Sequence, residues 1–281
     1  WIDALCNYLT SIGYPNENSA NFKNYWPALH VVGKDILRFH SVYWPAFLMA
    51  ADLEPPSRVF AHGWWTNEGE KISKSLGNVI DPYEIVSKYG LDQIRFFLFR
   101  EVPFGNDGDF SKDAIAQRLN ADLSNNYGNL VQRICSFVKK NCDSKIFNNF
   151  DNNEDDNILL KSSIKRLNNY NKYMGNQEID KAIKEVFLLL NEANTYVDKQ
   201  APWNLKKTNI ERMNSVLSIL IEIIKRIAIM TYPIMPNKSE LLLKYIKYNI
   251  DNISFSNIEK LPQKEFVIDK PEPLFPKYEK I

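Results

Sequence analysis

The chain has 281 residues, a formal net charge of +1, and a composition that is 44% hydrophobic and 13% aromatic. This length is enough for about two domains of ~100–200 residues, and the apolar content excludes a chain that is disordered by composition. The near-zero charge excludes a histone-like polycation but not local binding of RNA. Neither a run of about 18 apolar residues nor a signal peptide is visible, so we expect no membrane span.

The three cysteines, Cys6, Cys135 and Cys142, form no Cys-x-x-Cys pair. We therefore expect neither a zinc site nor a disulfide framework, and unpaired thiols favour a reducing compartment. The sequence starts at Trp1, without a methionine, inside a segment with an ordered pattern. This suggests a fragment of a longer protein.

The first predicted element is a helix that begins near Trp1. Apolar residues such as Leu5 and Leu9 recur at helical spacing, and Gly13 ends the pattern. The aromatic residues Trp1 and Tyr8 are by default part of the core.

A short buried strand is predicted at 29–33, and an apolar helix at 41–49. In open α/β sheets, ligands bind outside the carboxyl ends of the strands. Gly33 lets a ligand approach the backbone there, and Asp35 is a good acceptor for ribose hydroxyls. By default Asp35 caps a helix and His40 is a satisfied core histidine, and the residues alone favour that interpretation.

A second buried strand is predicted at 58–65, and the loop at 69–78 follows it. Glycines on either side favour sharp turns, and four polar groups lie within five residues: Lys71, Ser73, Lys74 and Ser75. Ammonium groups on a mobile loop suit a polyphosphate whose charge changes during a reaction, and the serines add hydrogen-bond donors. The alternative is an ordinary basic surface loop.

Two further helices are predicted at 82–90 and 90–99, and the turn-rich segment 103–108 is interpreted as a domain boundary. From residue 113 the pattern is helical almost to the end, with an Asn- and Asp-rich loop at 141–157. The predicted helices of this part are 115–138, 158–174, 178–200, 210–231 and 238–248. Amphipathic helices joined by short loops favour a helical bundle. The proline-rich tail is expected to be extended, with Leu274 and Phe275 as anchors.

Three side chains differ from the apolar stripes of this bundle. Asn129 and Arg133 are four residues apart and therefore share one helix face. Trp203 follows Pro202, where the long helix is expected to end, and a tryptophan at a helix end can be displayed as a stacking platform for an unpaired base. Taken alone, a solvated face for Asn129 and Arg133 and a bundle-filling role for Trp203 are favoured.

Several separated motifs resemble the methionyl branch of the class I aminoacyl-tRNA synthetases. Lys-Ile-Ser-Lys-Ser at 71–75 is similar to the family's second signature, Lys-Met-Ser-Lys-Ser, and it lies between a strand and a helix as in that family. The motifs Trp1-Ile-Asp-Ala-Leu-x-Asn-Tyr8 and Gly33-Lys-Asp-Ile-x-x-Phe-His40, with Trp44-Pro after the second, are similar to the methionine-pocket motifs. Asn129-Leu-Val-Gln-Arg133 and Gln200-Ala-Pro-Trp203 resemble the anticodon-reading elements.

The resemblance implies a role for each of these residues. Lys74 and Lys71 would be catalytic, with Lys74 stabilising the transition state of amino-acid activation. ATP would be bound by Gly33, Asp35, Lys71, Ser73, Lys74 and Ser75. The pocket for the methionine side chain would be lined by Trp1, Ala4, Leu5, Tyr8, Ile36, His40 and Trp44. The aromatic faces among them suit an unbranched thioether. Trp203 would stack on the anticodon, while Asn129 and Arg133 would hydrogen-bond base edges.

The implied fold is an α/β nucleotide-binding (Rossmann-like) catalytic half followed by an all-α helical bundle that binds the anticodon. It assigns 1–66 to the second half of the catalytic domain, 67–112 to the lysine-loop and stem-contact region, and 113–281 to the bundle with its extended tail. The implied reaction is activation of methionine by ATP with Mg²⁺ and transfer to tRNA(Met). No zinc is expected in this part of the chain. The implied location is a bacterial-type cytoplasm, or else an organellar matrix, and the oligomeric state is left open.

The family's first signature, His-x-Gly-His, does not occur in this sequence, and neither do the zinc-binding insertion and the first nucleotide-binding strand. We therefore expect the carboxyl-terminal part of such an enzyme, unable by itself to form the adenylate at a useful rate. Three alternatives remain open: a sibling synthetase for leucine or cysteine, a non-catalytic tRNA-binding module, and a helical scaffold without RNA contact.

Overall fold

The computed structural model describes residues 1–73, 75, 77–147, 153–258, 265–269 and 271–279. The chain forms two compact units, which are treated separately below. The first comprises Trp1–Asn78 with Phe104–Asp109, and the second comprises Val79–Pro103 with Phe110–Ile281. The predicted middle region, 67–112, is therefore shared between the two units.

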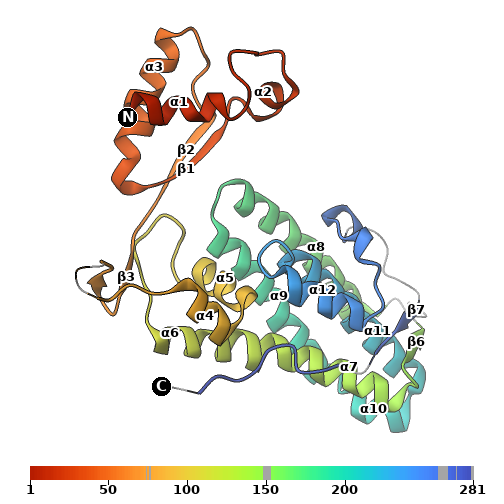
Figure 1. The fold of residues 1–281 in the computed structure, drawn as a ribbon. Helices are drawn as coiled ribbons and strands as arrows, with labels where there is room; N and C mark the ends of the chain where they lie inside the picture. Colours follow the sequence, from red (N-terminus) through yellow and green to blue (C-terminus); the bar gives the residue numbers. More distant parts are fainter. Residues whose placement is uncertain (74, 76, 148–152, 259–264, 270, 280–281) are drawn as a thin grey trace. The chain divides into compact units, whose positions relative to one another are not determined.

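The first unit is built on a two-stranded parallel sheet. Strands β1 (Leu29–Gly33) and β2 (Arg58–His62) pair along their whole length. The crossover between them contains a 3-10 turn (Lys34–Ile36), a π-helical turn (Phe39–Tyr43) and α3 (Trp44–Ala50) (Figure 1). Two parallel strands joined through a helix are the repeating unit of doubly wound α/β folds, as predicted.

Two amino-terminal helices complete the core of this unit. They are α1 (Ile2–Thr10) and α2 (Ala20–Tyr25). The Ser19 hydroxyl accepts the Phe22 N–H at 3.1 Å, so α2 has a side-chain cap at its start. The core is formed by large apolar side chains from α1, α2, α3 and the segment before β1: Leu5, Leu9, Phe22, Trp26, Trp44 and Leu48. Through this cluster α1, α2 and α3 pack against one another.

The prediction of one buried strand at 58–65 is wrong. The chain leaves β2 at His62 and enters β3 (Trp65–Asn67), and the side chains of both strands are partly exposed or exposed. Gly63 lies between the two strands. Only glycine fits there, because a Cβ would lie 2.1 Å from the Asn106 carbonyl oxygen. A small sheet of order β4-β3-β5 follows, with β4 at Glu70–Lys71 and β5 at Gly108–Asp109. The lysine loop extends from β4.

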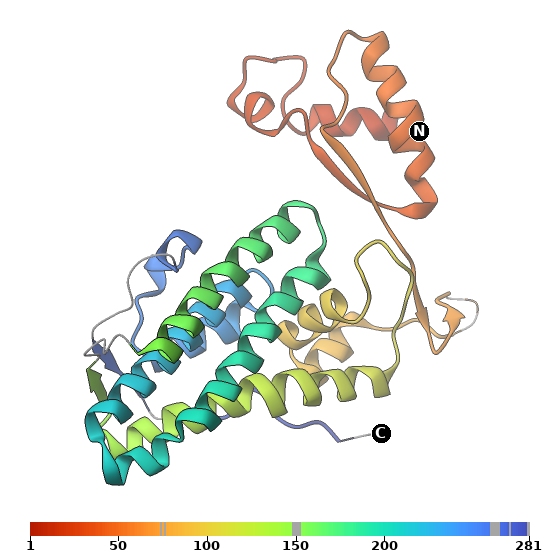
Figure 2. The same ribbon diagram turned by 180° about the vertical axis from the view of Figure 1, so that it is seen from behind.

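The second unit is a helical bundle, as predicted (Figures 1 and 2). Its helices are α4 (Pro82–Tyr89), α5 (Leu91–Arg100), α6 (Lys112–Arg118), a π-helical segment (Leu119–Gly128), α7 (Asn129–Asn141), α8 (Glu154–Gly175), α9 (Ile179–Gln200), α10 (Pro202–Thr208), α11 (Ile210–Thr231) and α12 (Pro236–Tyr245). Helix α11 packs against α7, α8, α9, α10 and α12, and every residue from Ser215 to Thr231 is buried. It is therefore the centre of the bundle.

Three charged residues in the buried stretch of α11 are joined by ion pairs, one carboxylate with two cations. Glu222 accepts from Lys225 Nζ at 2.7 Å and from Arg226 Nε at 2.8 Å, and Arg226 also donates to the Ser163 hydroxyl on α8 at 2.6 Å. A buried charge of this kind needs a charged or hydrogen-bonded partner.

Among the described helices, none is both long and apolar enough to cross a membrane.

Two sequence predictions in this unit need correction. The segment 141–157 is not only a loop, because it contains β6 (Lys145–Phe147) and the start of α8. Strand β6 pairs with β7 (Glu265–Val267), which lies far along the chain and is invisible to local patterns. The tail anchors Leu274 and Phe275 are buried, which confirms that prediction.

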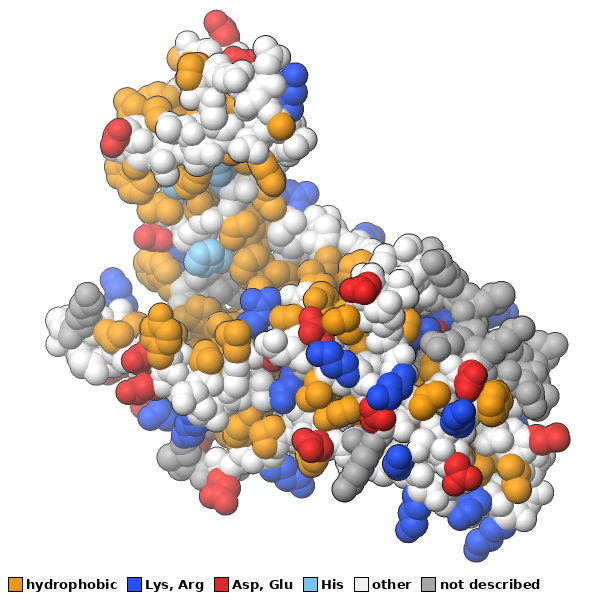
Figure 3. Space-filling view, turned by 45° about the vertical axis from the view of Figure 1, so that its right-hand side comes forward, with side chains coloured by type: hydrophobic (Ala, Val, Ile, Leu, Met, Phe, Trp, Pro, Cys, Tyr) orange, Lys and Arg blue, Asp and Glu red, His pale blue; other side chains and the backbone are white. Residues whose placement is uncertain are grey.

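Surface chemistry differs between the units when each is viewed by itself (Figure 3). The first unit exposes large apolar side chains on β1 and on the crossover, including Leu29, Val31, Val42 and Phe47. On the second unit, basic and acidic side chains are mixed with apolar ones. Neither pattern resembles the uniformly basic surface of a non-specific nucleic-acid binder.

Candidate functional site

Four aromatic side chains from different elements of the first unit meet one another. Tyr8 comes from α1, His30 from β1, His40 from the π-helical turn and Trp44 from the start of α3. The Tyr8 ring centroid lies 4.4 Å from that of His30, 5.7 Å from that of His40 and 6.4 Å from that of Trp44. Three residues that the sequence selected for one pocket are thus brought together, and a fourth joins them.

The hydrogen bonds of His40 determine which of its nitrogens carries the proton. His40 Nδ1 lies 3.0 Å from the Ile36 carbonyl oxygen, which can only accept, so Nδ1 is the donor. In the neutral ring Nε2 is then an acceptor, and the Tyr8 hydroxyl donates to it at 2.9 Å. Ile36, His40 and Tyr8 therefore form a chain with a defined direction, ending in a hydroxyl oxygen with acceptor capacity left.

The other residues predicted for the pocket have different surroundings. The Trp1 ring stacks on Phe39, with centroids 3.9 Å apart and planes 14° apart, and it meets His40 edge-on. Leu5 is fully buried in the core cluster beneath Trp44. Ala4 is exposed on α1. Trp1 is thus largely exposed, whereas Leu5 is part of the core.

Gly33 and Asp35 lie against each other at the end of β1. A Cβ on Gly33 would come within 2.5 Å of Asp35 Oδ1, so a larger residue there would make this carboxylate shift. Asp35 itself is exposed. The Asp35 carboxylate is thus an exposed acceptor next to the end of β1.

The side chain of Asn78 closes the base of the lysine loop. Asn78 Oδ1 accepts the Ser73 N–H at 2.9 Å, and its Nδ2 donates to the Lys71 carbonyl at 3.0 Å. The Asn78 carbonyl in turn accepts from Asn67 Nδ2 at 3.0 Å. The Ser73 and Ser75 hydroxyls are 3.1 Å apart. The predicted catalytic residue Lys74 lies outside the described residues.

Two lysines lie over one indole ring. Lys34 Nζ lies 4.4 Å and Lys71 Nζ 5.8 Å from the Trp64 ring centroid, distances at which a cation is attracted to an aromatic face. Asp107 accepts from Lys34 at 2.6 and 2.7 Å and from the Trp64 N–H at 2.8 Å. The hydrogen bond from Lys34 lowers the pKa of the Asp107 carboxyl, and the hydrogen bond from the Trp64 backbone N–H lowers it further. Lys34 is thereby ion-paired with Asp107, while both lysines lie near the Trp64 ring.

The predicted RNA-reading residues lie on the second unit. Arg133 donates to Asp198 Oδ1 at 2.7 Å, and its guanidinium carbon lies 5.2 Å from the Trp203 ring centroid. Trp203 is 42% exposed, so it does not fill the bundle. Asn129 is exposed one helical turn before Arg133. Arg133 and Trp203 therefore form one surface, with Asn129 on the same helix as Arg133.

The long helix ends at Gln200, as predicted, whereas the segment that carries Trp203 was not predicted to be helical. Pro202 does not end the long helix but begins a new one, α10, after Ala201 adopts a left-handed conformation with φ +45°. Proline at a first helical position is well tolerated, which explains the short helix. Nearby, Arg212 binds Asp156 at 2.6 and 2.7 Å and Gln200 at 2.8 Å, which fixes the end of α9.

Two family models match this chain. One, described as tRNA synthetases class I (M), matches residues 1–135, and the other, the anticodon binding domain of methionyl tRNA ligase, matches residues 148–280. The chain belongs to the methionyl-tRNA synthetase family. The family and the fold class predicted from the motifs are therefore confirmed.

Relatives and solved structures agree with this membership. The methionine--tRNA ligase of Brucella suis biovar 1 is 46% identical over 280 residues, which is 99% of this chain and 54% of the relative. That of Rickettsia bellii is 48% identical over 262 residues, which is 92% of this chain and 51% of the relative. A structure of Mycobacterium tuberculosis methionyl-tRNA synthetase in complex with methionyl-adenylate has a TM-score of 0.93 and 40% identity, covering 98% of this chain and 55% of that one. The chain spans about half the length of these members of the methionyl-tRNA synthetase family.

Four residues of the site were missed by sequence reasoning. They are His30, Trp64, Asn78 and Asp107. His30, Trp64 and Asp107 contact partners that are distant in sequence, whereas Asn78 bonds residues of its own loop. Only Asn78, directly after Gly77 at the loop's end, carried a local signal, because asparagine side chains commonly bond nearby backbone in turns. Among the described residues, no three His, Cys, Asp or Glu side chains are grouped so as to hold a metal ion.

Proposed function

We propose that this chain is the carboxyl-terminal half of a methionyl-tRNA synthetase, an enzyme that activates methionine with ATP and transfers it to tRNA(Met). The observation that carries the proposal is the aromatic pocket of Tyr8, His40 and Trp44, which lies in the same compact unit as Asp35 and the lysine loop. A pocket for an unbranched apolar side chain, a ribose acceptor and a cationic loop are the parts that amino-acid activation needs. Family membership supports this combination.

The pocket suits the thioether of methionine. Trp1, Tyr8 and Trp44 offer aromatic faces, which attract a polarisable sulfur. The pair Tyr8–His40 is the polar feature of this wall, and we assign to it the discrimination of sulfur from the methyl groups of leucine. Ala4, Leu5 and Ile36 complete the lining in this proposal.

The nucleotide would lie between the end of β1 and the lysine loop. We assign the adenosine ribose to Gly33 and Asp35, and the phosphates to Lys71, Ser73, Lys74 and Ser75. A methionine carboxylate oxygen attacks the α-phosphorus of ATP, and the bond from that phosphorus to the pyrophosphate oxygen breaks. Lys74 and Lys71 are proposed to stabilise the negative charge that develops on the departing pyrophosphate. Mg²⁺ would enter with the phosphate oxygens of ATP, the ligands this hard cation prefers.

In the second step a ribose hydroxyl at the tRNA terminus attacks the methionyl carbonyl, and AMP leaves. Catalysis is assigned to positioning and charge, so no side chain forms a covalent intermediate. The anticodon would be read by the second unit, where an unpaired base stacks on the exposed Trp203 ring and Asn129 and Arg133 bond base edges. Arg133 would exchange its bond to Asp198 for a base when RNA binds.

The same proposal assigns regions and setting. Residues 1–66 would belong to the catalytic domain, 67–112 to the loop and stem-contact region, and 113–281 to the anticodon-binding domain. The named relatives are bacterial, which supports a bacterial-type cytoplasm. No zinc is assigned to the residues of this chain.

The test is ATP–pyrophosphate exchange by the longer protein that carries this chain, with methionine, leucine and cysteine supplied separately. We expect exchange with methionine and none above background with leucine or cysteine. The 281-residue chain alone, at equal concentration, should give none. Exchange driven by leucine or cysteine would favour a sibling synthetase. No exchange at all, combined with anticodon-dependent tRNA binding, would favour a non-catalytic module.

A further inference from the structure

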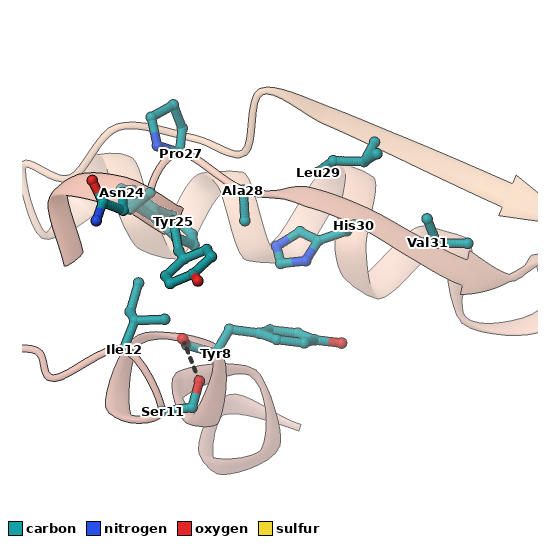
Figure 4. A pocket seen from close by; sticks show the side chains of 11 residues that line it. Tyr8, Ser11, Ile12, Asn24, Tyr25, Pro27, Ala28, Leu29, His30 and Val31 are labelled. Carbon is teal, nitrogen blue, oxygen red and sulfur yellow. Dashed lines mark hydrogen bonds between the residues drawn. The ribbon is translucent and has the colours of Figure 1, made fainter. Parts of the chain in front are cut away.

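His30 is a buried histidine with no role in the pocket assigned above. It lies on β1 and is only 5% exposed. Its ring contacts aromatic rings from three other parts of the unit, with centroid distances of 4.4 Å to Tyr8, 5.9 Å to His40 and 6.2 Å to Trp26. Figure 4 shows the His30 ring pointing from β1 toward the ring of Tyr8 on α1. Both residues line an open cavity of about 560 Å³.

The bond between His30 and Trp44 fixes the chemical state of His30. Trp44 Nε1 lies 3.2 Å from His30 Nε2, and an indole N–H can only donate. His30 Nε2 must therefore be unprotonated, and the bond is lost when the imidazole becomes an imidazolium. Burial lowers the pKa of His30, and the neighbouring His40 lowers it further. The titratable groups among its described ring neighbours are Tyr8 on α1 and His40 on the π-helical turn, whereas Trp26 and Trp44 carry no charge.

The two buried histidines of this unit thus bond different aromatic side chains. His40 orients the Tyr8 hydroxyl, and His30 orients the Trp44 indole while packing against the Tyr8 face. Trp44 is almost fully buried, so its N–H has little access to water. If the Trp44 indole rotated about its side-chain bonds, its N–H would lose His30 as acceptor. A buried donor without an acceptor costs free energy. The bond therefore selects one orientation of the Trp44 ring.

We propose that His30 is a positioning residue of the amino-acid pocket, which holds the Trp44 indole in one orientation and packs against the Tyr8 ring. This inference rests on the proposed function for the identity of the substrate as a thioether amino acid. Its structural part, the coupling of His30 to Trp44, is independent of any activity. The pocket then works only when His30 is neutral.

The coupling can be measured on the 281-residue chain itself by ¹⁵N NMR of its six tryptophan indole groups. The Trp44 signal is assigned by its loss in Trp44→Phe. We expect this signal to titrate in the unmodified chain with a midpoint below 6.5, the ordinary histidine value. His30→Gln, whose amide oxygen can still accept, should keep the signal without the titration, whereas His30→Leu should shift it toward that of a free indole. His62→Leu, at a histidine on the neighbouring strand, is the control and should leave it in place.

The second arm measures methionine-dependent ATP–pyrophosphate exchange by the longer protein. His30→Leu should raise KM for methionine about tenfold, the factor for one buried hydrogen bond, with KM for ATP unchanged within about twofold. His30→Gln should restore most of the loss. KM for methionine in the unmodified protein should rise as the pH falls below 6.5, and the part of this rise that is due to His30 should be lost in His30→Gln.

The inference is overturned if His30→Leu leaves the Trp44 signal unchanged, or if KM for methionine and KM for ATP rise equally. If His30→Leu fails to fold, the titration of the unmodified chain and its loss in His30→Gln decide the question. Absence of methionine-dependent exchange in the unmodified protein would instead contradict the proposed function, while the NMR result would still stand or fall on its own.

Discussion

Replacing Asn78 by alanine should weaken the use of ATP while leaving methionine binding intact. The Asn78 side chain makes two hydrogen bonds, of 2.9 Å with the Ser73 N–H and of 3.0 Å with the Lys71 carbonyl. One net hydrogen bond contributes about 0.5–1.5 kcal/mol, and partial exposure here favours the lower half of that range. Losing both bonds should make the ordered form of the loop about 1–2 kcal/mol less stable. If the ordered loop is the form that binds phosphates, its population falls about five- to thirtyfold.

The assay is ATP–pyrophosphate exchange by the longer protein, and the expected result is a fall of that size in kcat/KM for ATP. KM for methionine should change less than about twofold, because no pocket residue contacts Asn78 among the bonds described. Asn67→Ala is the matched control: it removes the single 3.0 Å bond to the Asn78 carbonyl and should cost only about two- to fivefold. An Asn78→Ala protein with unmodified ATP kinetics would refute the idea that this side chain closes the loop.

Three further predictions concern RNA binding, stability and pH. Trp203→Ala should weaken binding of tRNA(Met) to the 281-residue chain by about tenfold in a filter assay, because stacking on one base contributes ~1–3 kcal/mol; unchanged affinity would favour a scaffold without RNA contact. Glu222→Ala should lower the free energy of unfolding in urea by about 3–5 kcal/mol, since it leaves the buried Lys225 and Arg226 without their carboxylate; a loss below about 1 kcal/mol would contradict this. His30 should make the folded chain less stable as pH falls below 6.5, because its pKa is lowered on folding and the unfolded chain binds the proton first. His30→Gln should flatten that slope in urea titrations at pH 5 to 7, and an unaltered slope would show that other groups cause it.

Much of the fold followed from patterns that act over a few residues. Helices α9 and α11 were predictable because apolar residues recur at helical spacing, and the parallel pair β1–β2 was predictable as a strand, crossover and strand. The broken strand at 58–65 carried a usable signal, since a glycine inside a strand pattern marks a close backbone approach. Pro202 likewise fitted the first turn of a helix as well as the end of one.

The remaining features depend on contacts between distant segments. β6 is short and lies in an Asn-rich stretch, and it becomes a strand only because β7 pairs with it. His30 looked like an ordinary strand residue, and its function as an acceptor arises from the approach of Trp44 on another element. The motifs located the pocket, whereas the hydrogen bonds that orient its walls could be found only in three dimensions.

The most direct test of the account is a crystal structure of the longer protein with a non-hydrolysable analogue of methionyl-adenylate. The account predicts that the thioether lies against the rings of Tyr8, His40 and Trp44 and that the ribose hydroxyls bond the Asp35 carboxylate. Binding of the analogue elsewhere, with these four side chains untouched, would contradict it.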